Sequence, residues 1–185
     1  MMAREQYQPG PARGARIAKR EGDSWTLVLV RELPHSPEKV WKAITDPVHL
    51  REWAPFDSDG NLAAEGSTVR LTTVGAPTLL VTETTVTRAD PPRELVYNWG
   101  GNDMRWELEP ADGGTRLTLW TSIDRRYIAM GAAGWHVCFD VLDRLLGDAP
   151  VGRMVGMEVL KFDGWQRLVA EYKKQFAHEV QNPIP

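Results

Sequence analysis

The sequence lacks a surplus of charge, a second cysteine and any long apolar run. Its 22 basic and 25 acidic residues give a net charge of −3. We expect no nucleic-acid partner, because phosphate binding requires a concentrated excess of Lys and Arg. Cys138 is the single cysteine, which excludes an internal disulfide framework and favours a reducing compartment. No run of about 18 apolar residues occurs, so no membrane insertion is expected.

The N-terminal part also lacks the features of a targeting sequence. Residues 1–22 are polar and contain no apolar core of a signal peptide. Together with the lone cysteine, this predicts a cytoplasmic protein. The length of 185 residues suits one domain. We expect a flexible N-terminal leader over residues 1–13, a core domain over residues 14–147, and a C-terminal linker with an additional helix of the same domain over residues 148–185.

Motifs for catalysis and metal binding are missing as well. The chain has no Gly-rich phosphate loop, no His-Glu-x-x-His pair and no nucleophile elbow. Its four histidines lie at no metal-ligand spacing, so we predict no metal and no cofactor. Nothing in the pattern specifies an oligomeric state.

The sequence does contain a regular succession of strand and helix signals. Two stretches that favour strands, 15–19 and 24–31, flank a turn. Two short helices are predicted after Ser36 and Asp46, each of which can cap a helix and is followed by proline. Five further short strands are expected at residues 67–74, 78–87, 93–99, 103–109 and 115–122. Turn residues separate them at short intervals, which is typical of an antiparallel meander.

A long helix is expected over residues 126–146, where apolar residues recur with helical period, and a final helix begins at Asp163. In the preceding strands, Leu95, Tyr97 and Trp99 alternate with polar residues, so one sheet face is apolar and aromatic. Trp120 is out of phase with this face and is expected either under the final helix or at a bulge. The predicted fold class is α+β helix-grip, a curved antiparallel sheet of about six or seven strands over a long C-terminal helix.

Several segments carry a family resemblance in addition to this pattern. They are residues 31–50 (RELPHSPEKVWKAITDPVHL) running into Trp53, residues 90–99 (DPPRELVYNW), 106–110 (WELEP), 114–119 (GTRLTL) and 134–136 (GWH). In these segments the chain resembles the START-like (SRPBCC) superfamily and, within it, the family of Hsp90 ATPase activator homologues. The resemblance implies the helix-grip fold with a pocket between sheet and helix. Members of that family include ligand binders, cyclases and stress-response proteins.

The pocket implied by the resemblance would be lined by the aromatic sheet face and the long helix. The predicted ligand-binding residues are Trp53, Phe56, Tyr97, Trp99, Met104, Trp106, Leu119, Gly131, Gly134, Trp135, Cys138 and Phe139. Gly131 and Gly134 are informative because each glycine inside a helix costs about 1 kcal/mol relative to alanine. Either the helix packs tightly on the aromatic rings there or it leaves space for a ligand. With space, a Gly131→Leu side chain would fill it.

Three functions are compatible with these features. The leading hypothesis is binding of an apolar small molecule of polyketide, flavonoid or lipid type, since aromatic walls with few polar groups suit such ligands. The first alternative is an enzyme of the polyketide cyclase or hydratase kind that uses an acid or base at the pocket rim. The second alternative is a chaperone cofactor or protein-interaction module.

No catalytic residue is assigned, and His136 and Asp140 are the only candidates. They lie one helical turn apart, so the carboxylate can fix the imidazole tautomer. The pair is either a polar group at the pocket rim or a surface pair on the solvent flank of the helix. Cys138 is interpreted as a buried small apolar residue rather than a reactive thiol.

Overall fold

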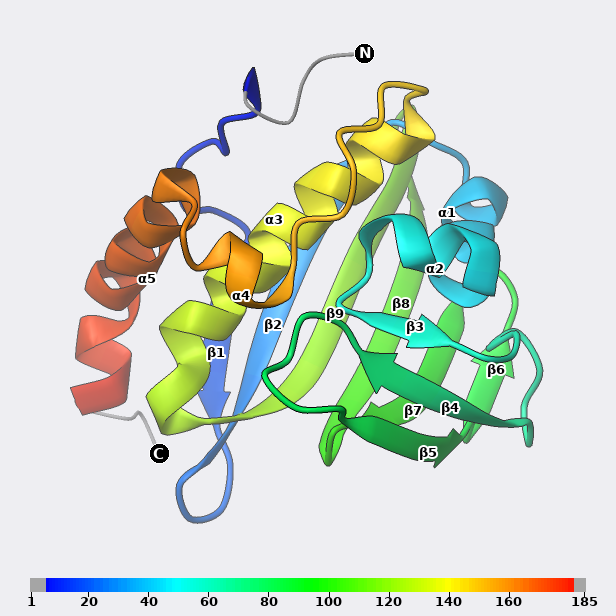
Figure 1. Cartoon of the computed structure of the whole chain (residues 1–185), viewed down its shortest axis with the longest axis horizontal. Helices are drawn as coiled ribbons and strands as arrows, with labels where there is room; N and C mark the ends of the chain where they lie inside the picture. The colour runs from blue at the N-terminus through cyan, green and yellow to red at the C-terminus, as the bar shows by residue number, and fades with distance from the viewer. Residues whose placement is uncertain (1–5, 182–185) are drawn as a thin grey trace.

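A six-stranded antiparallel sheet curves around one long helix, α3 (Ile128–Leu146), in the computed structural model. Figure 1 shows α3 lying across the concave face of the sheet. The structure describes residues 6–181. In spatial order the strands are β1 (Ala15–Lys19), β2 (Ser24–Leu33), β9 (Gly114–Asp124), β8 (Asn102–Ala111), β7 (Glu94–Trp99) and β6 (Arg88–Asp90). The arrangement confirms the predicted helix-grip class.

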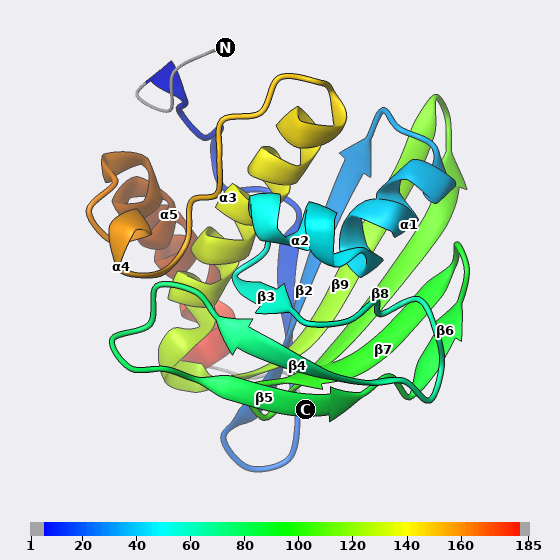
Figure 2. The ribbon, with the colours of Figure 1, turned by 45° about the vertical axis from the view of Figure 1, so that its right-hand side comes forward.

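A second, three-stranded sheet and four further helices complete the domain. The small sheet contains β3 (Phe56–Ser58), β4 (Thr68–Thr73) and β5 (Val81–Thr85), and the helices are α1 (Pro37–Thr45), α2 (Pro47–Trp53), α4 (Gly156–Val159) and α5 (Asp163–Gln181). A short 3-10 helix, η2 (Arg125–Tyr127), leads into α3. Figure 2 shows α1 and α2 above the small sheet, at one end of the curved sheet. No helix among residues 6–181 is long and apolar enough to cross a bilayer.

The two short helices begin where their capping residues predict. The Ser36 hydroxyl accepts a hydrogen bond from the backbone N–H of Lys39 at 3.3 Å, and the Asp46 carboxylate accepts one from Val48 at 2.9 Å. Each bond satisfies a backbone donor that has no partner inside the helix. The prolines that follow lose nothing by lacking an N–H at the first helical position. Both helices therefore start on local sequence signals.

The register of the large sheet brings the predicted aromatic residues onto one face. Leu95 lies opposite Trp106, and Tyr97 lies opposite Met104. The Trp106 indole N–H donates a hydrogen bond to the Tyr97 hydroxyl at 3.1 Å. Directly opposed residues in antiparallel strands share a face, so the concave face is aromatic as predicted.

The predicted strand 78–87 is wrong in its bounds and in its continuity. Its first residues lie in a loop, closed where Thr73 donates a backbone hydrogen bond to Leu80 at 2.9 Å. Strand β5 occupies only part of the range, and at the buried Val86 the chain turns into β6, which pairs with β7 in the large sheet. The physical reason is that the chain leaves the small sheet after Thr85 and joins the large sheet only at Arg88, beyond the predicted range. Strand β3, absent from the prediction, pairs with β4.

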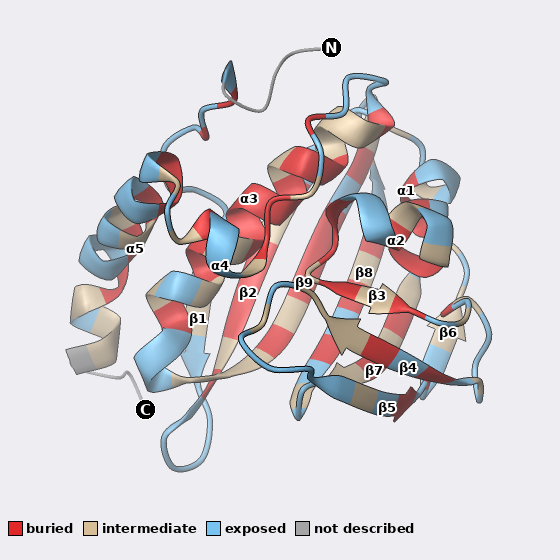
Figure 3. Cartoon of the chain, viewed as in Figure 1, coloured by how far each residue is buried: buried red, intermediate tan, exposed pale blue. Residues whose placement is uncertain are grey.

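Helix α3 is buried on two opposite sides. The large sheet covers one side, while α5 covers the other and also contacts the edge strand β1. Figure 3 shows α3 buried over most of its middle and upper part. Helix α5 presents the buried side chains of Leu168, Tyr172 and Phe176 to this contact. The extra helix therefore belongs to the core.

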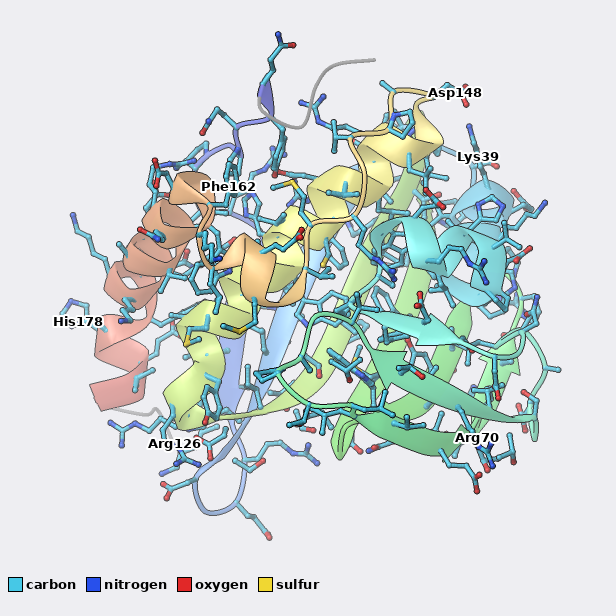
Figure 4. All side chains as sticks on the ribbon, viewed as in Figure 1. Lys39, Arg70, Arg126, Asp148, Phe162 and His178 are labelled. Carbon is cyan, nitrogen blue, oxygen red and sulfur yellow. The ribbon has the colours of Figure 1, made fainter. Side chains whose placement is uncertain are left out.

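Tyr7 packs the described part of the predicted leader against the same side of α3. Its ring is buried and stacks on Phe162 with centroids 5.8 Å apart, and Figure 4 shows Phe162 next to the N-terminal segment. Arg13 also bonds to α5, its backbone N–H donating to the Tyr172 hydroxyl at 3.2 Å. A flexible leader was expected over residues 1–13; residues 1–5 lie outside the described residues, and from Tyr7 onward the segment is packed.

Trp120 lies on the outer face of the sheet, as its phase predicts. It is not at a bulge, because the ladder continues through Val28 on one side and Arg105 on the other, and α5 packs against α3 and the edge strand β1 instead. The Arg105 guanidinium covers the indole at 4.7 Å from the ring centroid. A cation over an aromatic face is a stabilising contact, so this ring is accounted for without a helix.

Candidate ligand-binding site

A pocket of about 480 Å³ lies between the first half of α3 and the end of the sheet where β9 leads into η2. The remaining wall comes from the chain around α4. The lining residues are Pro55, Trp99, Asn102, Thr121, Ser122, Ile123, Asp124, Tyr127, Gly131, Gly134, Trp135, Cys138, Met154, Val155, Gly156 and Val159. A mostly apolar hollow of this size can hold a small organic molecule.

Five of the predicted ligand-binding residues line this pocket: Trp99, Gly131, Gly134, Trp135 and Cys138. Trp99 and Trp135 form an aromatic corner, with ring centroids 6.0 Å apart and ring planes at 82°. The indole N–H of Trp99 is already satisfied, since it donates to the Thr73 hydroxyl at 3.1 Å. The Trp99 ring therefore offers the pocket apolar surface rather than a hydrogen-bond donor.

The other seven predicted residues are outside this pocket. They are Trp53, Phe56, Tyr97, Met104, Trp106, Leu119 and Phe139, and all are buried. At the centre of this cluster the Trp106 ring meets the edges of Trp53 and Trp135, with centroids 6.1 Å and 5.6 Å apart. These seven side chains are packed in the core beside the pocket and do not line it.

The two helix glycines have different surroundings. A Cβ added at Gly134 would have no atom within 4 Å, whereas one at Gly131 would lie 2.5 Å from Ile123 Cδ1. The expectation that Gly131→Leu fills empty space is therefore wrong, because the Ile123 side chain occupies that position. Gly134 is the position where α3 leaves open space.

The wall around α4 was not anticipated from the sequence. Met154, Val155 and Val159 supply it, although the segment was expected only as a linker. Arg153 ties it to the body through an ion pair with Asp57 at 2.7 Å. The alternation of apolar residues with glycine over residues 151–157 was the available signal, but it does not indicate which surface the segment covers.

The pocket contains few polar groups and no unpaired charge. At its edge, the Arg126 side chain and backbone N–H donate hydrogen bonds to Asp124 and lower the pKa of that carboxyl to about 2. Burial raises the pKa of the Cys138 thiol to about 12, so it lines the wall as a neutral group. The uncharged polar residues of the lining are Asn102, Thr121, Ser122 and Tyr127. The site therefore suits a mainly apolar molecule.

His136 and Asp140 lie outside the pocket, on the side of α3 that α5 covers. Both earlier interpretations of His136 are wrong: it does not line the pocket, and it is buried rather than exposed. Its Nδ1 lies 2.8 Å from the Tyr172 hydroxyl. The reason is tertiary, because α5 and the N-terminal segment cover a flank that the isolated helix would leave in water.

Asp140 is the centre of this buried polar cluster. Its carboxylate accepts hydrogen bonds of 2.6 Å from both Tyr7 and Arg31, and its Oδ2 lies 3.5 Å from His136 Nε2. Burial favours the protonated acid, but the neighbouring His136 ring, the Arg31 charge and the hydrogen bond from Tyr7 outweigh it and lower the pKa of Asp140. The same burial, with the Asp140 charge, raises the pKa of Tyr7.

The hydrogen-bond pattern assigns the proton on His136. The Tyr172 hydroxyl donates to the Arg13 carbonyl at 2.9 Å, so its one proton is already used. His136 Nδ1 must then be the donor toward Tyr172, with Nε2 facing the Asp140 carboxylate. Apart from the His136–Asp140 contact within α3, the contacts of this cluster join different parts of the protein. It is a structural tie between β2, α3, α5 and the N-terminal segment.

The fold and the pocket define a helix-grip domain with an open apolar site beside its long helix. The family model described as activator of Hsp90 ATPase homolog 1-like protein matches residues 34–147. This is more than half of the chain, so the protein belongs to that family, and the predicted START-like resemblance is confirmed. No curated protein matches the sequence.

Solved structures show the same fold at low sequence identity. The crystal structure of CalU16 from Micromonospora echinospora is 18% identical, covers 91% of this chain and 98% of its own, and has a TM-score of 0.65. The solution structure of CalU16 gives 18% identity, 95% and 98% coverage, and a TM-score of 0.67. Protein MLL2253 from Mesorhizobium loti is 26% identical over 66% of this chain and 97% of its own, with a TM-score of 0.57.

Proposed function

We propose that the protein binds an apolar small molecule of polyketide, flavonoid or lipid type in the pocket beside α3. The observation that carries the proposal is the open space at Gly134, next to the corner formed by Trp99 and Trp135. Packed interiors leave few voids larger than a water molecule. Glycine is unfavourable inside a helix. A ligand that occupies the open space would explain why α3 has glycine at position 134.

The pocket lining does not contain the group on which the enzymatic alternative depended. His136 was the candidate acid or base, and it is buried in the cluster with Asp140 and Tyr172 on the other side of α3. No two titratable residues of the lining form a hydrogen-bonded pair. Asp124 is paired, but with Arg126, which lies outside the lining. No specific observation favours the chaperone-cofactor alternative over ligand binding.

The test is binding of the uncharged fluorescent probe N-phenyl-1-naphthylamine, followed by its emission and by tryptophan quenching. The wild type should bind the probe with saturable, one-site behaviour. Gly134→Leu should lower its affinity at least tenfold, because the leucine occupies the space that the ring would take. The same change should raise the unfolding free energy by up to about 1 kcal/mol, since leucine has the higher helix propensity.

Gly134→Ala is the matched control, because its methyl group gains most of the helix propensity and fills little of the pocket. It should retain probe binding within about threefold and show a similar gain in stability. If the wild type binds neither this probe nor any member of an apolar ligand panel, the proposed function is wrong. Equal binding by Gly134→Leu and wild type would place the ligand elsewhere.

A further inference from the structure

Well-exposed apolar side chains gather in the segments around the pocket. The seven large ones among the described residues are Val48, Leu79, Leu80, Val81, Tyr127, Met130 and Met157. All except Val48 belong to the β4–β5 connection with the start of β5, the junction of η2 with α3, or α4. Exposed apolar groups concentrated in one place mark an interaction site more often than scattered ones do.

The β4–β5 connection lies beside the pocket wall. The Gly75 carbonyl accepts a hydrogen bond from the Met157 N–H at 3.1 Å, and a Cβ added at Gly156, which lines the pocket, would lie 2.6 Å from the Gly75 Cα. Just before the connection, Thr73 at the end of β4 bonds to Trp99 of the aromatic corner. Figures 1 and 2 both show this loop passing close to α4.

We propose that the ligand site extends out of the pocket onto an apolar rim formed by Leu79, Leu80, Tyr127 and Met157, so that the natural ligand is an elongated apolar molecule longer than the pocket. This inference rests on the proposed function. Leu79 is 80% exposed and Leu80 52%, while Tyr127, 51% exposed, lines the pocket itself. The apolar surface of the pocket therefore reaches the outside at Tyr127 and beside Met157, which follows the lining residue Gly156 and bonds to the β4–β5 connection. A ligand that spans both would cover side chains that otherwise face water.

The charges beside the rim favour a small ligand over a bilayer surface. A surface that docks on anionic lipid carries an excess of Lys and Arg around its apolar residues. Here Arg125 and Arg126, which precede Tyr127, are balanced by Asp124 and by Glu158, which follows Met157. No such excess adjoins the rim. Continuity with the pocket supplies the other argument, because it makes the ligand of that pocket the natural occupant.

The experiment compares two probes that share a head group. Dansylamide is compact, and 11-(dansylamino)undecanoic acid adds a long alkyl chain. The wild type should bind the long probe more tightly. The double variant Leu79→Ser/Leu80→Ser should lose about tenfold in affinity for the long probe and less than twofold for dansylamide. Val48→Ser is the matched control, since Val48 is 64% exposed on α2, and it should change neither affinity.

Each other outcome overturns the inference in a recognisable way. Unchanged affinity of the double variant for the long probe, or an equal loss for both probes, shows that the rim does not hold the chain. Loss of sedimentation with vesicles of phosphatidylcholine and phosphatidylserine, with long-probe affinity intact, assigns the rim to a membrane instead. Failure of the wild type to bind either probe contradicts the proposed function itself. A melting curve of the double variant is the control that excludes unfolding as the cause of lost binding.

Discussion

Replacing Asp140 by asparagine tests whether the cluster behind α3 holds the fold together. The substitution keeps the shape of the side chain and removes its charge. It leaves the Arg31 guanidinium, which is 8% exposed and also bonded to the carbonyl oxygen of His136 at 3.4 Å, without a counter-charge. An uncompensated buried charge is the most expensive consequence of breaking such a pair.

The expected magnitude follows from this burial. Breaking a buried ion pair by removing one partner costs about 3–5 kcal/mol. For a chain of this size each kcal/mol lowers the melting temperature by roughly 2–4 °C, so Asp140→Asn should melt about 10 °C below the wild type at neutral pH. Thermal unfolding followed by circular dichroism measures the shift. Probe binding at low temperature should persist, because the pocket lies on the opposite side of α3.

Asp143→Asn is the matched control on the same helix. Asp143 is 44% exposed and lies 3.1 Å from His35 Nε2, and pairs this open to water contribute less than about 1 kcal/mol. It should therefore lower the melting temperature by only a few degrees. A drop of less than about 2 °C for Asp140→Asn, or equal drops for the two variants, would refute the assignment of this cluster as a structural tie.

The same cluster gives two further predictions. Tyr7→Phe keeps the stacked ring but removes the 2.6 Å bond to Asp140, so it should cost about 1.5–3 kcal/mol, the usual range for a bond to a charged group; unchanged urea unfolding would contradict this. Because the pKa of Asp140 is lowered in the folded state, its contribution is complete above the ordinary carboxyl pKa near 3.8 and is lost as the pH falls through the folded value. The wild type and Asp140→Asn should therefore converge in unfolding free energy toward acid pH, and a constant difference down to pH 2 would count against that sign.

Local signals in the sequence were sufficient to predict most of the fold. Capping by Ser36 and Asp46 fixes two helix starts, and alternation along β7 and β8 fixes which sheet face is apolar. Both signals act between residues close in sequence or on one strand. The end of β5 before Val86 could not be predicted this way, since it depends on the passage of the chain from the small sheet to the large one.

The candidate site was less predictable because depth is a tertiary property. Parity places Trp99 and Trp106 on one face, but only the packing of Trp53 and Phe139 decides that Trp106 is enclosed while Trp99 borders open space. His136 shows the same limit. Its helical position is compatible with solvent until α5 is docked, and no periodicity within the helix records that contact.

The two sides of α3 thus differ in what they contact, and this difference limits what relatives reveal about the proposed ligand. The side toward α5 holds the polar cluster of Asp140, and the side toward the sheet leaves the open space at Gly134. The family match ends at residue 147, whereas Met154, Val155 and Val159 supply one wall of the pocket. Relatives that share only the matched region share the packing of α3 on the sheet, but they lack this wall. The shape of the ligand must therefore be determined on this chain, with the wall and the rim in place.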